Sequence, residues 1–336
     1  MGRINRRTAL AGLSGAAALG IPGLRRARGQ VLDRVSFQTN WRAEAEHGGN
    51  YQAVAAGIYR RYGIDCDLRQ GGPQVNLQQI LLGERVDMIM SGGFQALGYV
   101  RENLPAVCVA AIMQKDPQVL IAHRGAGNDS FEAMRGKPIL VSGTGRITYW
   151  PFLRARFGYT DEQIRPYTFN LQPFAADRNT IQQGFLTSEP YTLRRQGLDP
   201  VVHLIADAGY DNYQETIDAR RAYVEEKPDL VQRFVNATLE GWRDYLYGDP
   251  GAANALIKRD NPEMEDGTLA YAIQAMKDHG LIVSGDAEQL GIGAMTDARW
   301  ERFFRQTVEY GLNPATMDFR RAYTLRFVNQ RVAMKP

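Results

Sequence analysis

Cysteine and histidine are scarce in this chain of 336 residues, which contains two cysteines and four histidines. A structural zinc site needs four such ligands at close spacing, so the sequence predicts no metal site. Cys66 and Cys108 both lie in segments that are expected to form strands. Each is expected to behave as a small buried apolar residue, although a disulfide between the two remains an alternative.

The chain also lacks a dense basic face beyond its first 30 residues. Those residues hold six arginines, no lysine and no acidic residue. The whole chain has a net charge of +3, from 40 basic and 37 acidic residues, and without the six arginines the charge becomes −3. Nucleic-acid-binding proteins carry a concentrated basic surface. Nucleic acid is therefore excluded as an expected partner.

The first 30 residues resemble an export signal. Asn5-Arg6-Arg7-Thr8-Ala9-Leu10 resembles a twin-arginine motif, and an Ala/Gly-rich run follows it as far as Leu24. This run is too short and too weakly apolar for a membrane-spanning helix. We therefore predict a twin-arginine signal peptide over residues 1–30 and a periplasmic location. An uncleaved basic amphipathic terminus is the alternative.

The segment after this terminus predicts two consecutive βα units. Alternation indicates a strand at residues 35–38, and apolar residues then recur at helical spacing over residues 51–62. Gly63 is placed to end this helix, and strands are expected at residues 64–68 and 86–90. Two such units imply a parallel sheet with right-handed crossovers. Ligands of such sheets bind outside the carboxyl ends of the strands.

The remaining chain predicts a second βα series and then a helical region. Apolar stripes over residues 228–246 and in a helix capped by Thr296 and ended by Gly311 are the clearest helical patterns. A length of about 306 residues after the signal suggests two lobes. Further strands are expected at residues 106–113, 119–122, 138–141, 184–188 and 201–206, and further helices near residues 147–157 and 174–183.

The order of these features resembles a known family. The likeness is carried by Trp41, Glu46-His47-Gly48-Gly49, Tyr51, Tyr62-Gly63-Ile64-Asp65, Gly71-Gly72-Pro73-Gln74-Val75-Asn76, Leu81-Leu82-Gly83 and Val86-Asp87, and more weakly by Ser188-Glu189-Pro190-Tyr191 and Pro228-Asp229-Leu230-Val231. These residues resemble the periplasmic solute-binding proteins of the nitrate, sulfonate, taurine and thiamine-pyrimidine-precursor group of ABC importers. The resemblance implies an α/β, type II periplasmic-binding-protein fold. Its two lobes would have mainly parallel sheets flanked by helices, with a ligand cleft between them.

The resemblance also implies how the chain is divided and what it does. Lobe one is expected to be discontinuous, formed by residues 31–116 and 207–336, and lobe two by residues 117–206. Hinges are expected at residues 114–118 and 206–209. The implied protein is a monomeric receptor without catalytic activity or cofactor. It delivers a small-molecule ligand to a permease and its ATPase in the inner membrane.

Residues with suitable chemistry lie at the ends of the predicted strands. Trp41 can stack on a flat ligand or belong to the core, and the same alternatives apply to Tyr51. His47 can contact a ligand at a helix start or only hold its loop. Glu189 can accept N–H donors or form a surface ion pair. The predicted ligand-binding residues are Trp41, His47, Tyr51, Ser91, Gly92, Gln114, Ser142, Thr144, Trp150, Glu189 and Tyr191.

A glycine-rich loop, Ser142-Gly143-Thr144-Gly145-Arg146, follows the strand expected at residues 138–141. A strand, a glycine-rich turn and a helix together can bind an anion or a carbonyl group. The loop lacks the third glycine of a dinucleotide-binding fingerprint, and the chain contains no P-loop, so no nucleotide cofactor is expected. Arg146 can pair with a ligand anion or extend into solvent.

An aromatic residue together with a carboxylate favours a small aromatic or nitrogen-heterocyclic nutrient, similar to a thiamine pyrimidine precursor or a flavin. An organic anion such as a sulfonate, an aromatic carboxylate or nitrate, held by helix N-termini and Arg146, is the alternative ligand. The fungal pyrimidine synthases that share the implied fold use a cysteine-rich segment, which this chain lacks. An enzyme of that type is therefore the weaker interpretation, and a sensor subunit for a membrane kinase is a third.

Overall fold

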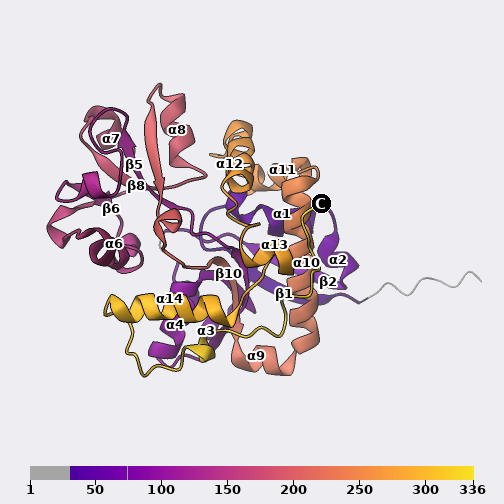
Figure 1. Ribbon diagram of the computed structural model, residues 1–336. Coiled ribbons are helices and arrows are strands. Elements are labelled where there is room, and N and C mark those ends of the chain that lie inside the picture. Colours follow the sequence, from indigo (N-terminus) through magenta and orange to yellow (C-terminus); the bar gives the residue numbers. More distant parts are fainter. Residues whose placement is uncertain (1–30, 74) are drawn as a thin grey trace, which may run out of the picture. The chain divides into compact units, whose positions relative to one another are not determined.

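Two five-stranded mixed sheets organise the part of the chain that this computed structural model describes, residues 31–73 and 75–336 (Figure 1). Both sheets belong to one unit of mutual contacts, Leu32–Pro336. The predicted signal peptide lies outside the described residues. No helix in the described part combines the length and the apolar character needed to cross a membrane.

The first sheet is built from segments far apart in the sequence. Its strands are β1 (Asp33–Gln38), β2 (Ile64–Arg69), β3 (Met88–Gly92), β4 (Ala106–Met113) and β10 (Gln214–Arg220). They lie in the order β2-β1-β3-β10-β4. β1 pairs in parallel with β2 and β3, whereas β10 runs antiparallel to both β3 and β4. Four strands therefore share one direction and β10 opposes them.

The second sheet repeats this arrangement. Its strands are β5 (Gln118–His123), β6 (Ile139–Val141), β7 (Ile164–Pro166), β8 (Ile181–Phe185) and β9 (Pro200–Leu204), in the order β7-β6-β8-β5-β9. β6 is parallel to β7 and β8, and β5 is antiparallel to β8 and β9. The expectation of mainly parallel sheets is thus confirmed for strand direction, and one opposed strand makes each sheet mixed.

The chain passes between the two sheets twice. The first crossing segment, residues 114–117, joins β4 to β5, and the second crossing segment, residues 205–213, joins β9 to β10. Each opposed strand directly follows one of these crossings. The predicted lobe boundaries stay a prediction. The strands of the first sheet all lie within residues 31–116 and 207–336, and those of the second sheet within residues 117–206.

Helices surround the sheets, and most of those after β10 lie beside the first sheet (Figure 1). Short one-turn segments complete the fold, among them the 3-10 helix η1 (Ala45–His47). The helices are α1 (Gly48–Ala55), α2 (Ile58–Arg61), α3 (Leu77–Leu82), α4 (Gly93–Arg101), α5 (Gly143–Ile147), α6 (Trp150–Phe157), α7 (Gln172–Ala176), α8 (Glu189–Arg195), α9 (Arg221–Glu226), α10 (Pro228–Tyr247), α11 (Gly251–Asp260), α12 (Asp266–Asp278), α13 (Asp286–Leu290) and α14 (Asp297–Glu309).

The single helix predicted over residues 51–62 is wrong, because two helices occupy this stretch. Gly57 separates α1 from α2 and adopts a left-handed conformation with φ of 66°. Glycine reaches this region without the steric cost of a side chain. The break changes the direction of the apolar stripe, so that Ile58 and Tyr59 remain buried while Val54 is 36% exposed.

The helix predicted near residues 174–183 is also wrong in extent. α7 ends at Ala176, and β8 begins at Ile181, before the strand expected at residues 184–188. Gln182 and Gln183 are almost fully buried in this strand, 0% and 4% exposed. Consecutive glutamines favour a solvent-exposed helix by composition, and only their packing inside the second sheet explains the strand.

The two predicted C-terminal helices are confirmed. α10 buries the expected stripe from Leu230 to Leu246, and Thr296 caps α14 by accepting a hydrogen bond from the Arg299 N–H at 3.4 Å. α10 packs closely on α1 because both contribute glycine. A Cβ atom on Gly49 would lie 2.2 Å from the Trp242 ring, which leaves no room for a larger residue.

Both cysteines are free in the structure. Cys108 is buried in β4, and Cys66 is half-buried in β2. The disulfide that the sequence left open is therefore not formed.

Candidate ligand-binding site

Four glutamates from the two sheets lie close together: Glu44 and Glu46 after β1, Glu215 in β10, and Glu189 at the start of α8. Burial raises the pKa of the Glu44 carboxyl well above its usual value, and the charges of the other three glutamates raise it further. Carboxylates affect one another in this way at short range. We call these four residues the carboxylate cluster. Among the described residues no three His, Cys, Asp or Glu side chains are arranged to hold a metal ion.

A side-chain hydrogen bond links the cluster, on the segment after β1, to the second sheet. The hydroxyl of Thr187, which follows β8, donates to the carboxylate of Glu46 in η1. Glu46 is 3% exposed, and burial raises its pKa. A buried carboxylate with a hydroxyl donor is held in one place. The segment that follows β1 is thereby tied to the second sheet.

An aromatic surface lies beside the cluster. The rings of Trp41 and Phe169 have centroids 5.3 Å apart at an interplanar angle of 43°, and Tyr167 lies 5.2 Å from Phe169. Trp41 is half-buried, while Phe169 is 55% exposed and has a positive φ of 61°. A large exposed aromatic in a strained backbone conformation is a feature of ligand-binding sites.

Glu189 is fixed between this aromatic surface and the second sheet. Its carboxylate accepts a hydrogen bond from the Tyr167 hydroxyl at 3.1 Å and another from the Phe185 N–H at 2.8 Å. Burial raises the pKa of Glu189, and these two donors oppose the rise. Two donors leave part of the acceptor capacity of a carboxylate unused. Glu189 can therefore receive N–H groups from a ligand.

His47 acts on the cluster through Asn40. The Asn40 amide N–H₂ donates to both oxygens of Glu215, at 3.0 and 3.2 Å, so its carbonyl oxygen is left to accept from His47 Nε2 at 2.9 Å. His47 is fully buried, and burial lowers its pKa to about 3. The imidazole is therefore neutral, and it orients Asn40 toward Glu215.

The glycine-rich loop forms the one-turn helix α5. Ser142 caps it by accepting from the Gly145 N–H at 3.1 Å, and the Ser142 N–H donates to the side-chain oxygen of Gln183 at 2.5 Å. The Tyr149 hydroxyl donates to the same oxygen at 3.0 Å. Ser142 is nearly buried, whereas Thr144 is exposed. The side-chain oxygen of Ser142 is thus engaged within the loop itself.

Gln114 belongs to the first crossing segment. It is fully buried, and its amide N–H₂ donates to the carbonyl oxygens of Ala111 and Ala294 at 3.2 and 2.9 Å. The two crossing segments also contact each other, because Asn212 donates to the Asp116 carboxylate at 2.8 Å. This places Gln114 at the connection between the sheets.

The other predicted residues have contacts of their own. The Tyr51 hydroxyl donates to Asp260 at 3.0 Å, and Trp150, which is 1% exposed, donates through Nε1 to Asp161 at 3.1 Å. Tyr191 stacks on Tyr271 of α12 with centroids 5.1 Å apart. The structure therefore brings together Trp41, His47 and Glu189, whereas it places Tyr51, Trp150 and Tyr191 against other helices and loops.

Ser91 and Gly92 lie at the carboxyl end of β3, as expected from the sequence. The Ser91 hydroxyl lies 3.5 Å from that of Tyr99. A Cβ atom on Gly92 would come within 2.4 Å of the Gln214 side-chain oxygen, so β10 approaches β3 closely here. Gly92 thus permits the close pairing that positions Glu215.

Glu44, Glu46, Tyr167, Phe169 and Glu215 are absent from the sequence prediction. Acidic residues alternate in Glu44-Ala45-Glu46, which only His47 separates from a Gly-Gly pair, and aromatic residues alternate in Tyr167-Thr168-Phe169 directly after β7. Both patterns follow a strand end and are available signals. Glu215 offers a weaker one, an acidic residue within a strand that is otherwise buried.

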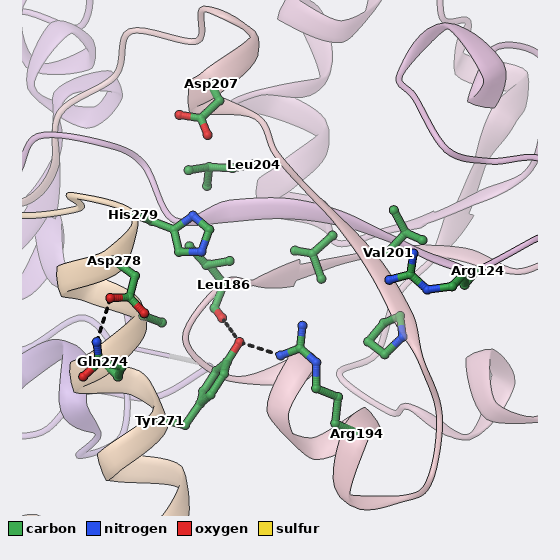
Figure 2. Close-up of a pocket in the computed structure, with 13 residues that line it drawn as sticks. Arg124, Leu186, Arg194, Val201, Leu204, Asp207, Tyr271, Gln274, Asp278 and His279 are labelled. Carbon is green, nitrogen blue, oxygen red and sulfur yellow. Dashed lines mark hydrogen bonds between the residues drawn. The ribbon is translucent and has the colours of Figure 1, made fainter.

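A separate cavity of about 470 Å³ lies between β9 and α12 (Figure 2). Tyr271 is at its wall, with its hydroxyl between the Leu186 carbonyl and the Arg194 guanidinium, each at 3.1 Å. Neither the carboxylate cluster nor any predicted ligand-binding residue lines this cavity. It is therefore distinct from the candidate site.

Known proteins resemble this chain over most of its length. A model of the NMT1/THI5-like family matches residues 44–253. The riboflavin-binding protein RibY of Chloroflexus aurantiacus is 25% identical over 306 residues, which cover 89% of this chain and 87% of that protein. The 4-amino-5-hydroxymethyl-2-methylpyrimidine phosphate synthase of Aspergillus parasiticus is 22% identical over 237 residues, 66% of this chain and 69% of that protein.

Solved structures resemble it in fold. The periplasmic aliphatic sulphonate binding protein SsuA from Escherichia coli superimposes with a TM-score of 0.65 at 11% sequence identity, covering 86% of this chain and 91% of that one. At this identity the likeness concerns the fold alone. It confirms the periplasmic-binding-protein fold expected from the sequence.

Proposed function

This chain belongs to the NMT1/THI5-like family, and we propose that it is the exported solute-binding receptor of an ABC importer, with a small aromatic or nitrogen-heterocyclic nutrient as its ligand. The observation that carries the proposal is Glu189, whose carboxylate is held beside the Trp41–Phe169 aromatic pair. A flat ring can lie against the aromatic side chains while its N–H groups donate to the carboxylate.

The charge of the site supports a neutral or cationic ligand over an anion. Four glutamates converge here, and the pKa of Glu44 is raised by burial and by the other three carboxylates, with no basic side chain among the causes. A sulfonate, an aromatic carboxylate or nitrate would bring a further negative charge to buried acids that already ionise with difficulty, without a compensating arginine. The names of two relatives, for riboflavin and for an aminopyrimidine phosphate, also refer to nitrogen heterocycles.

A receptor is favoured over a synthase by the cysteines. The chain has two, Cys66 in β2 and Cys108 in β4, and no cysteine-rich segment. In the proposed role the protein is a periplasmic monomer, exported by the twin-arginine route, that passes its ligand to a membrane permease and its ATPase. Formation of a pyrimidine by the purified protein with iron, oxygen and pyridoxal phosphate would favour the synthase instead.

The ligand class is tested by a thermal-shift screen of flavins, aminopyrimidines, aromatic acids, sulfonates and nitrate. A ligand present at about 100 times its dissociation constant stabilises the folded protein by about 2.7 kcal/mol, which is readily measured. We expect flavins or aminopyrimidines to raise the melting temperature. A shift with sulfonates or nitrate alone would contradict the proposed class.

Glu189→Gln should weaken binding of the ligand found in this screen about 5- to 150-fold, because the amide cannot accept N–H donors as a carboxylate does. Calorimetric titration measures the loss. Glu240→Gln is the control, since Glu240 pairs with Arg61 at 2.6 Å outside the candidate site. Equal affinities of Glu189→Gln and the wild type would remove Glu189 from the site.

A further inference from the structure

We propose that Glu215 is a second ligand-contacting residue of this site and that it selects solutes able to bring a hydrogen-bond donor, N–H or O–H, to the first sheet as well as an N–H donor to Glu189 beside the second. The inference rests on the proposed function and narrows its ligand class to flat heterocycles that carry two separate donor groups. It is carried by the backbone of β10, by the contacts of the Glu215 carboxylate and by the charges around it.

The backbone of β10 is distorted at Glu215. The pairing of β10 with β3 shifts register between Gln214 and Thr216, which leaves Glu215 as the extra residue of a bulge. Its φ is 51°, in the left-handed region that a residue with a side chain seldom adopts. Bulges next to binding sites re-aim a side chain out of the ladder. Here the re-aimed side chain reaches Asn40, at the end of β1.

The carboxylate of Glu215 has a single donor residue. The residue is 1% exposed, and within the described residues its only hydrogen-bond donor is the Asn40 amide, which reaches both oxygens, at 3.0 and 3.2 Å. A carboxylate offers about four acceptor positions, so about half of this capacity remains free. A ligand in the candidate site can supply the further donors.

Two other buried acids of this region serve as a comparison for the number of hydrogen-bond donors. Asp218, on the same strand, accepts from Tyr99 and from Thr216, each at 2.8 Å. Asp116 accepts from Asn212 at 2.8 Å and from the Gln118 N–H at 3.0 Å. Each of these carboxylates has two different donor residues. Glu215 has one, as does Glu46 of the same cluster, whose donor is Thr187.

The groups that face Glu215 keep it protonated without a ligand. Burial raises its pKa to about 8, Asn40 opposes the rise, and the charges of Glu46 and Asp116 add to it. Glu44 also lies close, because the charge of Glu215 raises the pKa of Glu44. His47, on the far side of Asn40, is neutral, and no lysine or arginine is among the causes. A ligand N–H that donates to Glu215 favours the ionised carboxylate, so binding near neutral pH releases its proton to solvent.

The sign of the pH dependence follows from this release. The free protein holds the proton below about pH 8. In the proposed complex the ligand donor keeps the carboxylate ionised. Affinity should therefore rise with pH, by up to about tenfold per unit, and level off above that value. A ligand bound without contact to Glu215 would show no such slope from the protein.

The test is calorimetric titration of the wild type and Glu215→Gln with riboflavin, 4-amino-5-hydroxymethyl-2-methylpyrimidine and ethanesulfonate at pH 6, 7 and 8, in two buffers of different ionisation enthalpy. A probe with N–H donors should bind the wild type with release of up to one proton at pH 7. Glu215→Gln should bind it about 10- to 100-fold more weakly and without that proton release. The titration of the probe itself is measured separately and subtracted.

Asp218→Asn is the matched control, because it removes a buried acid of the same strand whose donors lie away from the cluster. It should keep both the affinity and the proton release. If Glu215→Gln does not fold, Asn40→Ala replaces it. Loss of the only donor should then move the proton release to higher pH, and an unchanged profile would overturn the inference.

Two other outcomes would overturn it in different ways. If the donor probes bind the wild type and Glu215→Gln equally, with the same proton release, the role of Glu215 fails while the proposed function stands. If ethanesulfonate binds the wild type and no donor probe does, the proposed ligand class fails and the inference fails with it.

Discussion

Trp41→Ala is expected to weaken ligand binding about 5- to 150-fold, the effect of losing one stacking partner worth about 1 to 3 kcal/mol. The melting temperature of the ligand-free protein should stay nearly unchanged. Trp41 is half-buried, and its aromatic contact is with the exposed Phe169, so its removal opens little of the core. Calorimetric titration measures affinity, and differential scanning calorimetry measures stability.

Trp150→Ala provides the opposite case. Trp150 is 1% exposed and bonded to Asp161, so truncation should lower the free energy of unfolding by about 3 to 5 kcal/mol. The fraction that remains folded should bind the ligand with wild-type affinity. A loss of several kcal/mol in Trp41→Ala, with unchanged affinity, would show that Trp41 belongs to the core.

Arg299→Met should destabilise the protein by about 3 to 5 kcal/mol, measured by chemical unfolding, because it leaves buried partners of a charge unpaired. Arg299 lies in α14 and is 8% exposed. Its guanidinium donates to the Gln114 carbonyl, pairs with Asp211 at 3.0 Å and lies 4.2 Å from the Tyr213 ring centroid. One side chain therefore holds both crossing segments against the same helix.

Arg302→Met is the control for this prediction. Arg302 also pairs with Asp211, at 2.9 Å, but its side chain is 60% exposed. Surface ion pairs contribute about 0 to 1 kcal/mol, and its loss should be correspondingly small. Equal destabilisation by the two variants would mean that the contacts of Arg299 with the crossing segments add nothing to stability.

The sequence identifies most of the first sheet and the longest helices. The strands around Val35, Cys66 and Met88 alternate and are bounded by glycines, and α10 carries a complete apolar stripe, so local pattern suffices. The pattern fails where tertiary packing decides. Gln182 is polar yet buried in β8, and Gly57 interrupts a stripe whose spacing alone predicts one continuous helix.

The candidate site is only partly predictable for the same reason. Three predicted residues follow or adjoin strand ends, namely Trp41, His47 and Glu189. Ligands of parallel sheets bind outside the carboxyl ends of the strands, so the topology predicts these positions. Phe169 and Glu215 become relevant only because the segment after β7 meets the segment after β1 and because a bulge turns Glu215 out of β10. Neither the contact of these segments nor the bulge depends on a few neighbouring residues alone. No local sequence motif therefore predicts the roles of Phe169 and Glu215.

The position of β10 has a consequence for the order in which the chain can fold. β10 lies between β3 and β4, which therefore have no direct pairing with each other. A nascent chain that ends before residue 214 has all strands of the second sheet but only an incomplete first sheet, with β4 unpaired. Unpaired strand edges invite wrong partners. The first sheet is thus begun first and completed last. The seven residues of β10 complete it and pair the free edges of β3 and β4, which are otherwise open to wrong pairing.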